Sequence, residues 1–281
     1  MHSRIKLSPE NSRALEDIAR ELEELAKTRG TFIVPILMDD TRSISHYFVS
    51  EVYDRLLNSS ITAKNIDVII HSAGGDADAA YHLATILQEI CEGKLTMIVP
   101  RYAKSAATLL ACGGDVIVMD LPSELGPIDP QLEDPVTGRY TSGSSVRNTI
   151  EYIQKLSGPL LKELCQRLPV IQIRDHESLV KHVKECLKEL LCERMFKDET
   201  EKAEEIAEKL TTGYSYHGRA ITLREAKKVG LKIETLPRDQ WQKFGRFLEY
   251  LKRKCWLEDE KYGCKGVTPF YWQENRKFRP T

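Results

Sequence analysis

The stretch that decides the fold is residues 66–90, IDVIIHSAGGDADAAYHLATILQEI, together with residues 95–111, LTMIVPRYAKSAATLLA. Each begins with a short apolar run of the kind that forms a buried strand. After a turn, each continues with the spacing of a helix. Glycines 74 and 75 mark the first turn, and small residues after Ser105 open the second helix. Strands that alternate with helices predict a parallel sheet with right-handed crossovers.

The same alternation continues on both sides of this stretch. Residues 31–38 and 116–120 are further predicted strands, and residues 45–57 are a predicted helix. Pro35 has no N–H for a ladder hydrogen bond, so the first strand is expected at a sheet edge or a bulge. Reactive groups in such sheets gather at the carboxyl ends of the strands, where the two turns lie.

The second half of the chain is expected to be mainly helical. Residues 121–145 are rich in Pro, Gly and Ser and lack periodicity, which indicates a functional or flexible loop. Two long charged helices are predicted over about 146–167 and 176–210. Residues 211–236 have the pattern of a loop, a helix and a short strand.

Three parts are predicted along the chain: an N-terminal helix over 1–30, an α/β domain over 31–236 and a C-terminal extension over 237–281. Ser8-Pro9 supplies a capping hydroxyl and a first-turn proline for the N-terminal helix. The extension holds all three Trp residues, interleaved with Lys and Arg. Docking on its own domain is favoured over a partner surface or an RNA-contacting patch, because Trp rings carry large buriable area.

The composition predicts a soluble cytoplasmic protein. Lys and Arg number 41 against 42 Asp and Glu, so the net charge is too small to attract nucleic acid or an anionic membrane to the protein as a whole. No run approaches the roughly 18 apolar residues that span a bilayer. The seven Cys include no Cys-x-x-Cys pair, so we expect no metal and no cofactor, and their odd number indicates reduced thiols.

Ser105 and the glycine pair carry the chemical signal. A serine before a small apolar helix is by itself most simply an N-cap, and a Gly-Gly turn between strand and helix is by itself most simply structural. The two features together indicate a functional site more strongly than either does alone. The N–H groups of Gly75 and Ala106 could converge on one developing oxyanion, which is the geometry that acyl transfer needs.

The order of these segments, followed by LGPIDPQ at residues 125–131, resembles the Clp-protease/crotonase superfamily and, within it, the serine dehydrogenase proteinase family. That family is distantly related to the Clp proteolytic subunit and to signal peptide peptidase A. The resemblance covers about residues 31–236. It implies a Clp/crotonase-like α/β spiral of βαβ units with long helices, here with a C-terminal extension. It also implies a serine peptidase with Ser105 as nucleophile and Gly74 and Gly75 in the oxyanion hole.

The general base has to be assigned separately. The Clp subunit keeps a histidine where this chain has Asp129, and a free carboxylate is a poor base for serine. His217 lies in TGYSYHGRAI, residues 212–221, which resembles a Gly-x-x-x-His segment of the serine dehydrogenase proteinase family. The predicted triad is therefore Ser105, Asp129 and His217, with Asp129 orienting the imidazole.

Lysine is the rival base, as in signal peptide peptidase A. Lys104 is adjacent to Ser105, and neighbouring side chains at a helix start seldom meet. Lys155, on the helix after the loop, is the better lysine candidate. His71, His176 and His182 are weaker candidates than His217.

Two other functions stay open beside the peptidase. An acyl-coenzyme A enzyme of the crotonase branch would use the same backbone oxyanion hole without needing Ser105. A non-catalytic scaffold, or pseudoprotease, would bind peptide or protein partners on the same fold. Because relatives assemble into rings or trimers, a homo-oligomer acting on a peptide or protein substrate is expected.

Overall fold

The computed structural model describes residues 20–250, apart from residues 40, 60, 62, 134–137 and 139. The predicted helix start at Ser8-Pro9 lies outside the described residues. So do the second and third tryptophans, Trp256 and Trp272.

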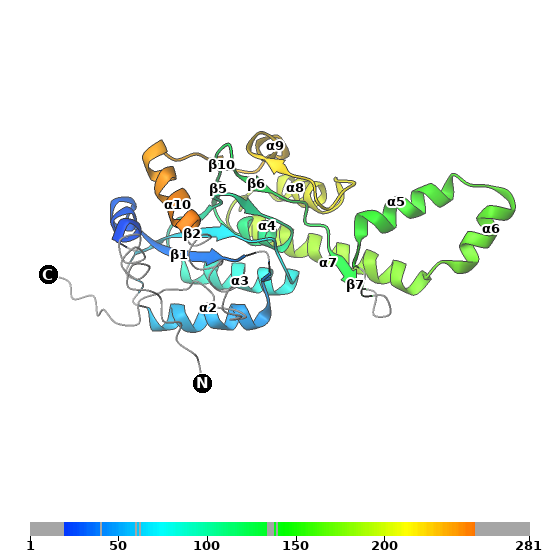
Figure 1. The fold of residues 1–281 in the computed structure, drawn as a ribbon, viewed down its shortest axis with the longest axis horizontal. Helices are drawn as coiled ribbons and strands as arrows, with labels where there is room; N and C mark the ends of the chain where they lie inside the picture. The colour runs from blue at the N-terminus through cyan, green and yellow to red at the C-terminus, as the bar shows by residue number, and fades with distance from the viewer. Residues whose placement is uncertain are drawn as a thin grey trace.

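A five-stranded parallel sheet forms the centre of the molecule (Figure 1). Its strands, in spatial order, are β1 (Thr31–Leu37), β2 (Asn65–His71), β3 (Leu95–Ile98), β5 (Val116–Val118) and β10 (Ile233–Glu234). All four pairings are parallel, which confirms the predicted βαβ pattern. Strand β1 lies at an edge of the sheet, where Pro35 is tolerated because it withdraws only one donor from the ladder.

Alternate residues of the strands pack on two different helical layers, as the two-residue period of a strand requires. Val34 and Val68 belong to the larger cluster. This cluster includes residues of α2 (His46–Asn58), α3 (Ala77–Ile90), α4 (Ala106–Ala111), α7 (Val170–Glu193) and α8 (Thr200–Thr212). Ile33 and Ile69 belong to a smaller cluster with Leu25, Trp241 and Phe244. Trp241 therefore docks on its own chain.

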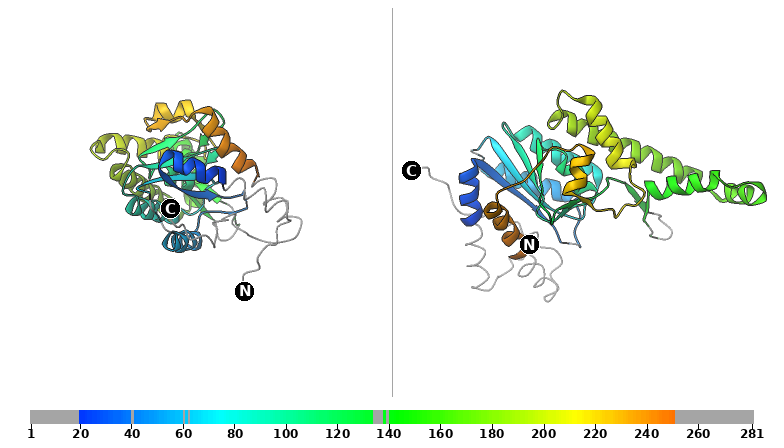
Figure 2. Two further views of the ribbon diagram at one scale, coloured as in Figure 1. Left: turned by 90° about the vertical axis from the view of Figure 1, so that its left-hand side faces the viewer. Right: turned by 90° about the horizontal axis from the view of Figure 1, so that it is seen from above.

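The smaller layer consists of the helical residues 20–29 and α10 (Arg238–Tyr250), which lie side by side in Figure 2. Leu25 is buried, as its place in the apolar stripe of the N-terminal helix predicts, and Gly30 follows in the left-handed conformation. Both ends of the described chain thus cover the same face of the sheet.

The prediction of two long charged helices is wrong, because this region forms four: α5 (Gly143–Gln154), α6 (Gly158–Arg167), α7 (Val170–Glu193) and α8 (Thr200–Thr212). Gly158 has φ +73° and Pro159 follows it, which breaks the first predicted helix. Pro169 then separates α6 from α7. Helices α5 and α6 extend away from the sheet as an arm (Figures 1 and 2).

Part of the predicted loop 121–145 is also structured, because β7 (Gln131–Glu133) and β8 (Tyr140–Ser142) pair as an antiparallel ribbon at the base of the arm. A second small sheet contains β4 (Tyr102–Ala103), β6 (Glu124–Leu125) and β9 (Ile221–Thr222). The helix α9 (Leu223–Val229) follows β9 directly. This small sheet joins three segments that are far apart in sequence, and it positions the residues considered next.

Candidate active site

Ser105 occupies a strained turn between β4 and α4. Its backbone has φ 50° and ψ −121°, and it is the one non-glycine residue with positive φ in the part of the chain that the structure describes. An N-cap serine normally has extended backbone and accepts a hydrogen bond from the first turn of its helix. Ser105 does neither. Its hydroxyl is therefore not occupied as a cap, and strain of this kind is found at functional positions.

The glycine turn packs directly against the serine turn. A Cβ atom placed on Gly74 would lie 3.0 Å from the Cβ of Ser105 and 3.2 Å from the nitrogen of Ala106. Gly74 also has φ +114°, so glycine is required there both by conformation and by the close approach. Ser72 links the two turns, because its N–H donates to Tyr102 O and its carbonyl accepts from Lys104 N. The structure thus brings Gly74, Ser105 and Ala106 together.

Gly75 is held from its other side by the segment before α2. Ile44 N donates to Gly74 O at 2.8 Å, and Asp76 N donates to Ile44 O at 2.9 Å. A Cβ on Gly75 would collide with the backbone of Ile44. Within the described residues, the N–H groups of Gly75 and Ala106 donate no hydrogen bond. Two backbone donors therefore remain available beside the serine.

Asp129 is a buried carboxylate, 2% exposed, at the N-terminus of α5. Its Oδ1 accepts from Ser144 N at 3.1 Å, and its Oδ2 accepts from the Ser144 hydroxyl at 2.5 Å. Gly143 allows this approach, since a Cβ there would lie 3.1 Å from Asp129 Oδ1. The positive end of the helix dipole favours the carboxylate at this place.

His217 faces Asp129 from the loop before β9. Its Nδ1 lies 4.0 Å from Asp129 Oδ2, and the side chain is 28% exposed. No hydrogen bond to this Nδ1 is formed within the described residues. The loop is tied to the arm by Asn148 Nδ2, which donates to Ser215 O at 3.2 Å. The structure thus places Asp129 and His217 as neighbours.

The small sheet explains why both groups lie at one edge. Ala103, Leu125 and Ile221 stand in one row across β4, β6 and β9. Strands β4 and β6 are parallel, whereas β9 is antiparallel to β6. The segments that follow β4 and β6, which contain Ser105 and Asp129, therefore lie at the same edge of the small sheet as the segment before β9, which contains His217.

The Thr108 hydroxyl strengthens this arrangement by donating to Gly126 O at 2.9 Å and accepting from Gly126 N at 3.1 Å. It thereby fastens the chain before Asp129 to α4, the helix that Ser105 precedes.

Of the two lysines considered as bases, Lys104 pairs with other groups and Lys155 lies far along the arm. Lys104 Nζ is 3.0 Å from Glu124 Oε1 and donates to Leu125 O at 3.2 Å. Lys155 is exposed at the C-cap of α5. The 12-residue helix α5 begins beside Asp129, and at the usual rise it carries Lys155 about 18 Å along the arm.

Ser144 is a residue of the candidate site that sequence reasoning missed, whereas His176 is there ranked only as a weaker candidate base. The run of Ser and Gly at 142–145 is a usable signal for a helix start, because the Ser142 side chain caps α5 by accepting from Ser145 N. His176 is 5% exposed on α7, and burial lowers its pKa although the charges of Asp129 and Asp175 act in the opposite direction.

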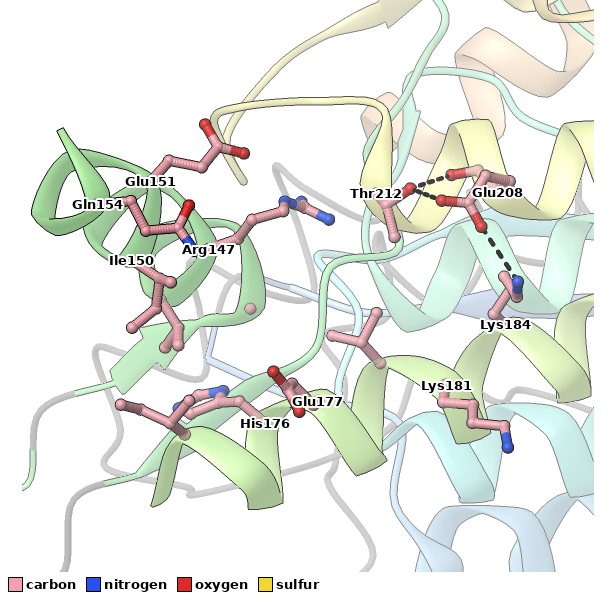
Figure 3. Close-up of a pocket in the computed structure, with 14 residues that line it drawn as sticks. Arg147, Ile150, Glu151, Gln154, His176, Glu177, Lys181, Lys184, Glu208 and Thr212 are labelled. Carbon is pink, nitrogen blue, oxygen red and sulfur yellow. Dashed lines mark hydrogen bonds and ion pairs between the residues drawn. The ribbon is translucent and has the colours of Figure 1, made fainter. Parts of the chain in front are cut away.

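A cavity of about 440 Å³ adjoins this region between α5, α7 and α8 (Figure 3). His176 lines it from α7, and Arg147 and Ile150 line it from α5. Glu208, at its rim, accepts a hydrogen bond from Lys184. Gly143 also lines the cavity, and it precedes Ser144, whose N–H and hydroxyl donate to Asp129.

A parallel α/β core with a strained serine beside a glycine turn is the arrangement expected of a Clp-type fold. The family model described as "ClpP-like SDH-type serine proteinase" matches residues 47–254. The chain belongs to this family, and the expected Clp-like fold is confirmed.

Two relatives come from Methanocaldococcus jannaschii. The uncharacterized protein MJ1495 is 34% identical over 79% of this chain and 74% of its own length. The uncharacterized protein MJ0137 is 30% identical over 77% of this chain and 70% of its own length.

Similar solved structures include a serine-to-alanine mutant of the 1510-N membrane-bound stomatin-specific protease. It is 17% identical, with TM-score 0.47, over 76% of this chain and 83% of that one. Another is an asparagine-to-aspartate mutant of ClpP1 from Listeria monocytogenes, which is 15% identical, with TM-score 0.37, over 78% of this chain and 98% of that one. In the part of this chain that the structure describes, we find no helix with the length and apolar character to cross a membrane.

Proposed function

We propose that this protein is a serine peptidase in which Ser105 forms an acyl-enzyme. The observation that carries the proposal is the backbone conformation of Ser105, which departs from that of an N-cap. The Ser105 hydroxyl therefore accepts no capping hydrogen bond, and the residue lies beside Gly74. A serine on a sharp strand-to-helix turn is the arrangement that exposes a nucleophile in other hydrolases. Ser105 is also partly exposed, so a substrate can reach it.

In the proposed reaction, the Ser105 oxygen attacks the carbonyl carbon of a peptide bond while the His217 imidazole takes the serine proton. The carbonyl oxygen becomes an oxyanion that accepts hydrogen bonds from Gly75 N–H and Ala106 N–H. When the C–N bond breaks, the leaving amine takes the proton from His217. A water molecule, activated by the same imidazole, then hydrolyses the ester on Ser105 and restores the serine.

The roles of the other two residues follow from their surroundings. Asp129 is buried and accepts two hydrogen bonds from Ser144, which suits a carboxylate that orients an imidazole. With His217 Nδ1 turned to Asp129, Nε2 is the nitrogen left for proton transfer. The cavity that reaches Gly143 is the proposed place for a substrate side chain. We expect the enzyme to be a homo-oligomer, in keeping with its family.

Labelling with a fluorophosphonate tests the proposal. The folded protein should form one adduct, which peptide mapping should locate on Ser105, and both heat denaturation and Ser105→Ala should abolish it. A folded protein that stays unlabelled across pH 6–9 would favour the scaffold function. Hydrolysis of acyl-coenzyme A thioesters by Ser105→Ala would favour the crotonase function.

A further inference from the structure

Apart from the proposed triad, three side chains with metal-binding chemistry meet where α3 begins beside α7. Asp78 lies in the first turn of α3, and His182 and Cys186 lie one turn apart on α7. Their ligand atoms are all within 4.8 Å of one another. Residues four apart on a helix share a face, which is how helices present pairs of metal ligands.

Both partners of His182 approach the same ring nitrogen. Nε2 lies 2.6 Å from Asp78 Oδ1 and 3.7 Å from Cys186 Sγ. One imidazole nitrogen either donates or accepts a hydrogen bond, so Nε2 cannot donate to the carboxylate and accept from the thiol together. A Cys–His–Asp nucleophile arrangement would instead use the two ring nitrogens for the two partners. Three donor atoms that surround one point fit a cation better than a proton.

We propose that Asp78, His182 and Cys186 bind a Zn²⁺ ion, with water as the fourth ligand. Thiolate, imidazole and carboxylate are the three ligand types that zinc takes in proteins. Tetrahedral zinc at its usual bond lengths separates such donors by about 3.3–3.6 Å. The sulfur–nitrogen distance of 3.7 Å is already close to that range.

The remaining distances can adjust, since the side chains of Asp78 and His182 are 58% and 50% exposed. Their exposure also gives the ion an open path from solvent. Cys186 is buried beneath them, so the ion would cap a thiol that water does not reach freely. Bound zinc would join α3 to α7.

The charges around Cys186 favour a cation. The carboxylates of Asp78, Glu189 and Glu185 act on Cys186 through their negative charge. A divalent ion is attracted by these charges, and it displaces the thiol proton when it binds.

The test is metal titration of the full-length protein after removal of metals with a chelator. Co²⁺ serves as a spectroscopic probe, and Zn²⁺ then competes with it in the presence of a chelating dye. We expect one equivalent to bind, with a thiolate-to-cobalt charge-transfer band that Zn²⁺ abolishes. Zn²⁺ should also raise the Tm, because it binds the folded state.

Variants assign the ligands. Cys186→Ser should lose the charge-transfer band, and Asp78→Asn, at an exposed position that should not disturb folding, should weaken Zn²⁺ binding at least about tenfold. Cys192→Ser, on the same helix, and His82→Gln, on α3, are matched controls that should bind like wild type. The proposal is overturned if wild type takes up no stoichiometric Zn²⁺, or if Asp78→Asn and Cys186→Ser both bind as wild type does. None of these readouts depends on peptidase activity.

Discussion

The ring of His217 presents Nδ1 to the buried carboxylate of Asp129, with 4.0 Å between Nδ1 and Oδ2. This contact joins the loop after β6 to the loop before β9, which are far apart in the chain. The antiparallel pairing of Leu125 with Ile221 makes it possible. A histidine late in the sequence therefore lies beside a carboxylate near the middle of the chain.

His217→Gln should lower kcat by about 10²–10⁴, the usual contribution of a general base. The fold should persist, because the side chain is partly exposed and its Nδ1 makes no hydrogen bond within the described residues. Peptide hydrolysis measured beside the His82→Gln control checks this. A His217→Gln enzyme whose kcat is within tenfold of the wild-type value would favour a lysine as the general base.

Ser105→Ala and Ser105→Gly should both abolish peptide hydrolysis, with losses on the order of 10⁵–10⁶ in kcat, but they should differ in stability. Alanine keeps the strain of φ 50°, whereas glycine adopts positive φ at little cost. Ser105→Gly should therefore be more stable than Ser105→Ala by about 1 kcal/mol. Urea unfolding of the two variants measures the difference. Equal stabilities would mean that the serine turn is not strained in solution.

Ser144→Ala should lower kcat about tenfold while leaving KM nearly unchanged. It removes the hydroxyl that donates to Asp129 Oδ2 at 2.5 Å, so the carboxylate loses one of its two fixed contacts and orients His217 less well. The backbone donor at residue 144 remains. Ser145→Ala, at the exposed position next to it, is the matched control. If Ser144→Ala raises KM and spares kcat while Ser145→Ala changes neither, Ser144 acts on substrate binding and not on the triad.

The sequence predicts the central sheet well because its strands are apolar runs bounded by turn residues. Pro35 predicts an edge or a bulge for β1, and the strand lies at the edge. It does not predict the small sheet, because strands of two residues such as Tyr102–Ala103 have no measurable period. Nor does it place Ser144 beside Asp129, since that contact depends on where the arm begins. The break at Gly158 was visible in the sequence, but charged segments on both sides suggested one continuous helix.

Gly75→Ala should destabilise the fold more than Gly30→Ala, although both glycines have positive φ. At Gly30 no atom lies within 4 Å of an added Cβ, so only the conformational cost of about 1 kcal/mol applies. At Gly75 the Cβ would collide with the Ile44 backbone, which must move and take the Gly75 N–H with it. Urea unfolding should rank the two variants, and Gly75→Ala should also lose about 10²–10³ in kcat. A Gly75→Ala protein with normal stability and normal kcat would contradict the proposed oxyanion hole.

His176 should make the protein less stable in acid. Burial on α7 lowers its pKa below the ordinary histidine value of 6.5, so the unfolded chain takes up the proton at a higher pH than the folded protein does. Stability is then lost as the pH falls through the unfolded value toward the lower folded value. The opposing charges of Asp129 and Asp175 reduce this effect but do not reverse it. Wild type should therefore show a decline in Tm below about pH 6.5 that is shallower in His176→Gln.

The matched control is His82→Gln, because His82 is exposed on α3 and its replacement should leave the slope of Tm against pH unchanged. Calorimetry of the three proteins between about pH 7 and pH 5 spans the window in which an ordinary histidine takes up its proton. A slope in His176→Gln as steep as that of wild type would show that other groups cause the acid sensitivity. A shallower slope would show that protonation of the buried His176 causes part of the acid sensitivity.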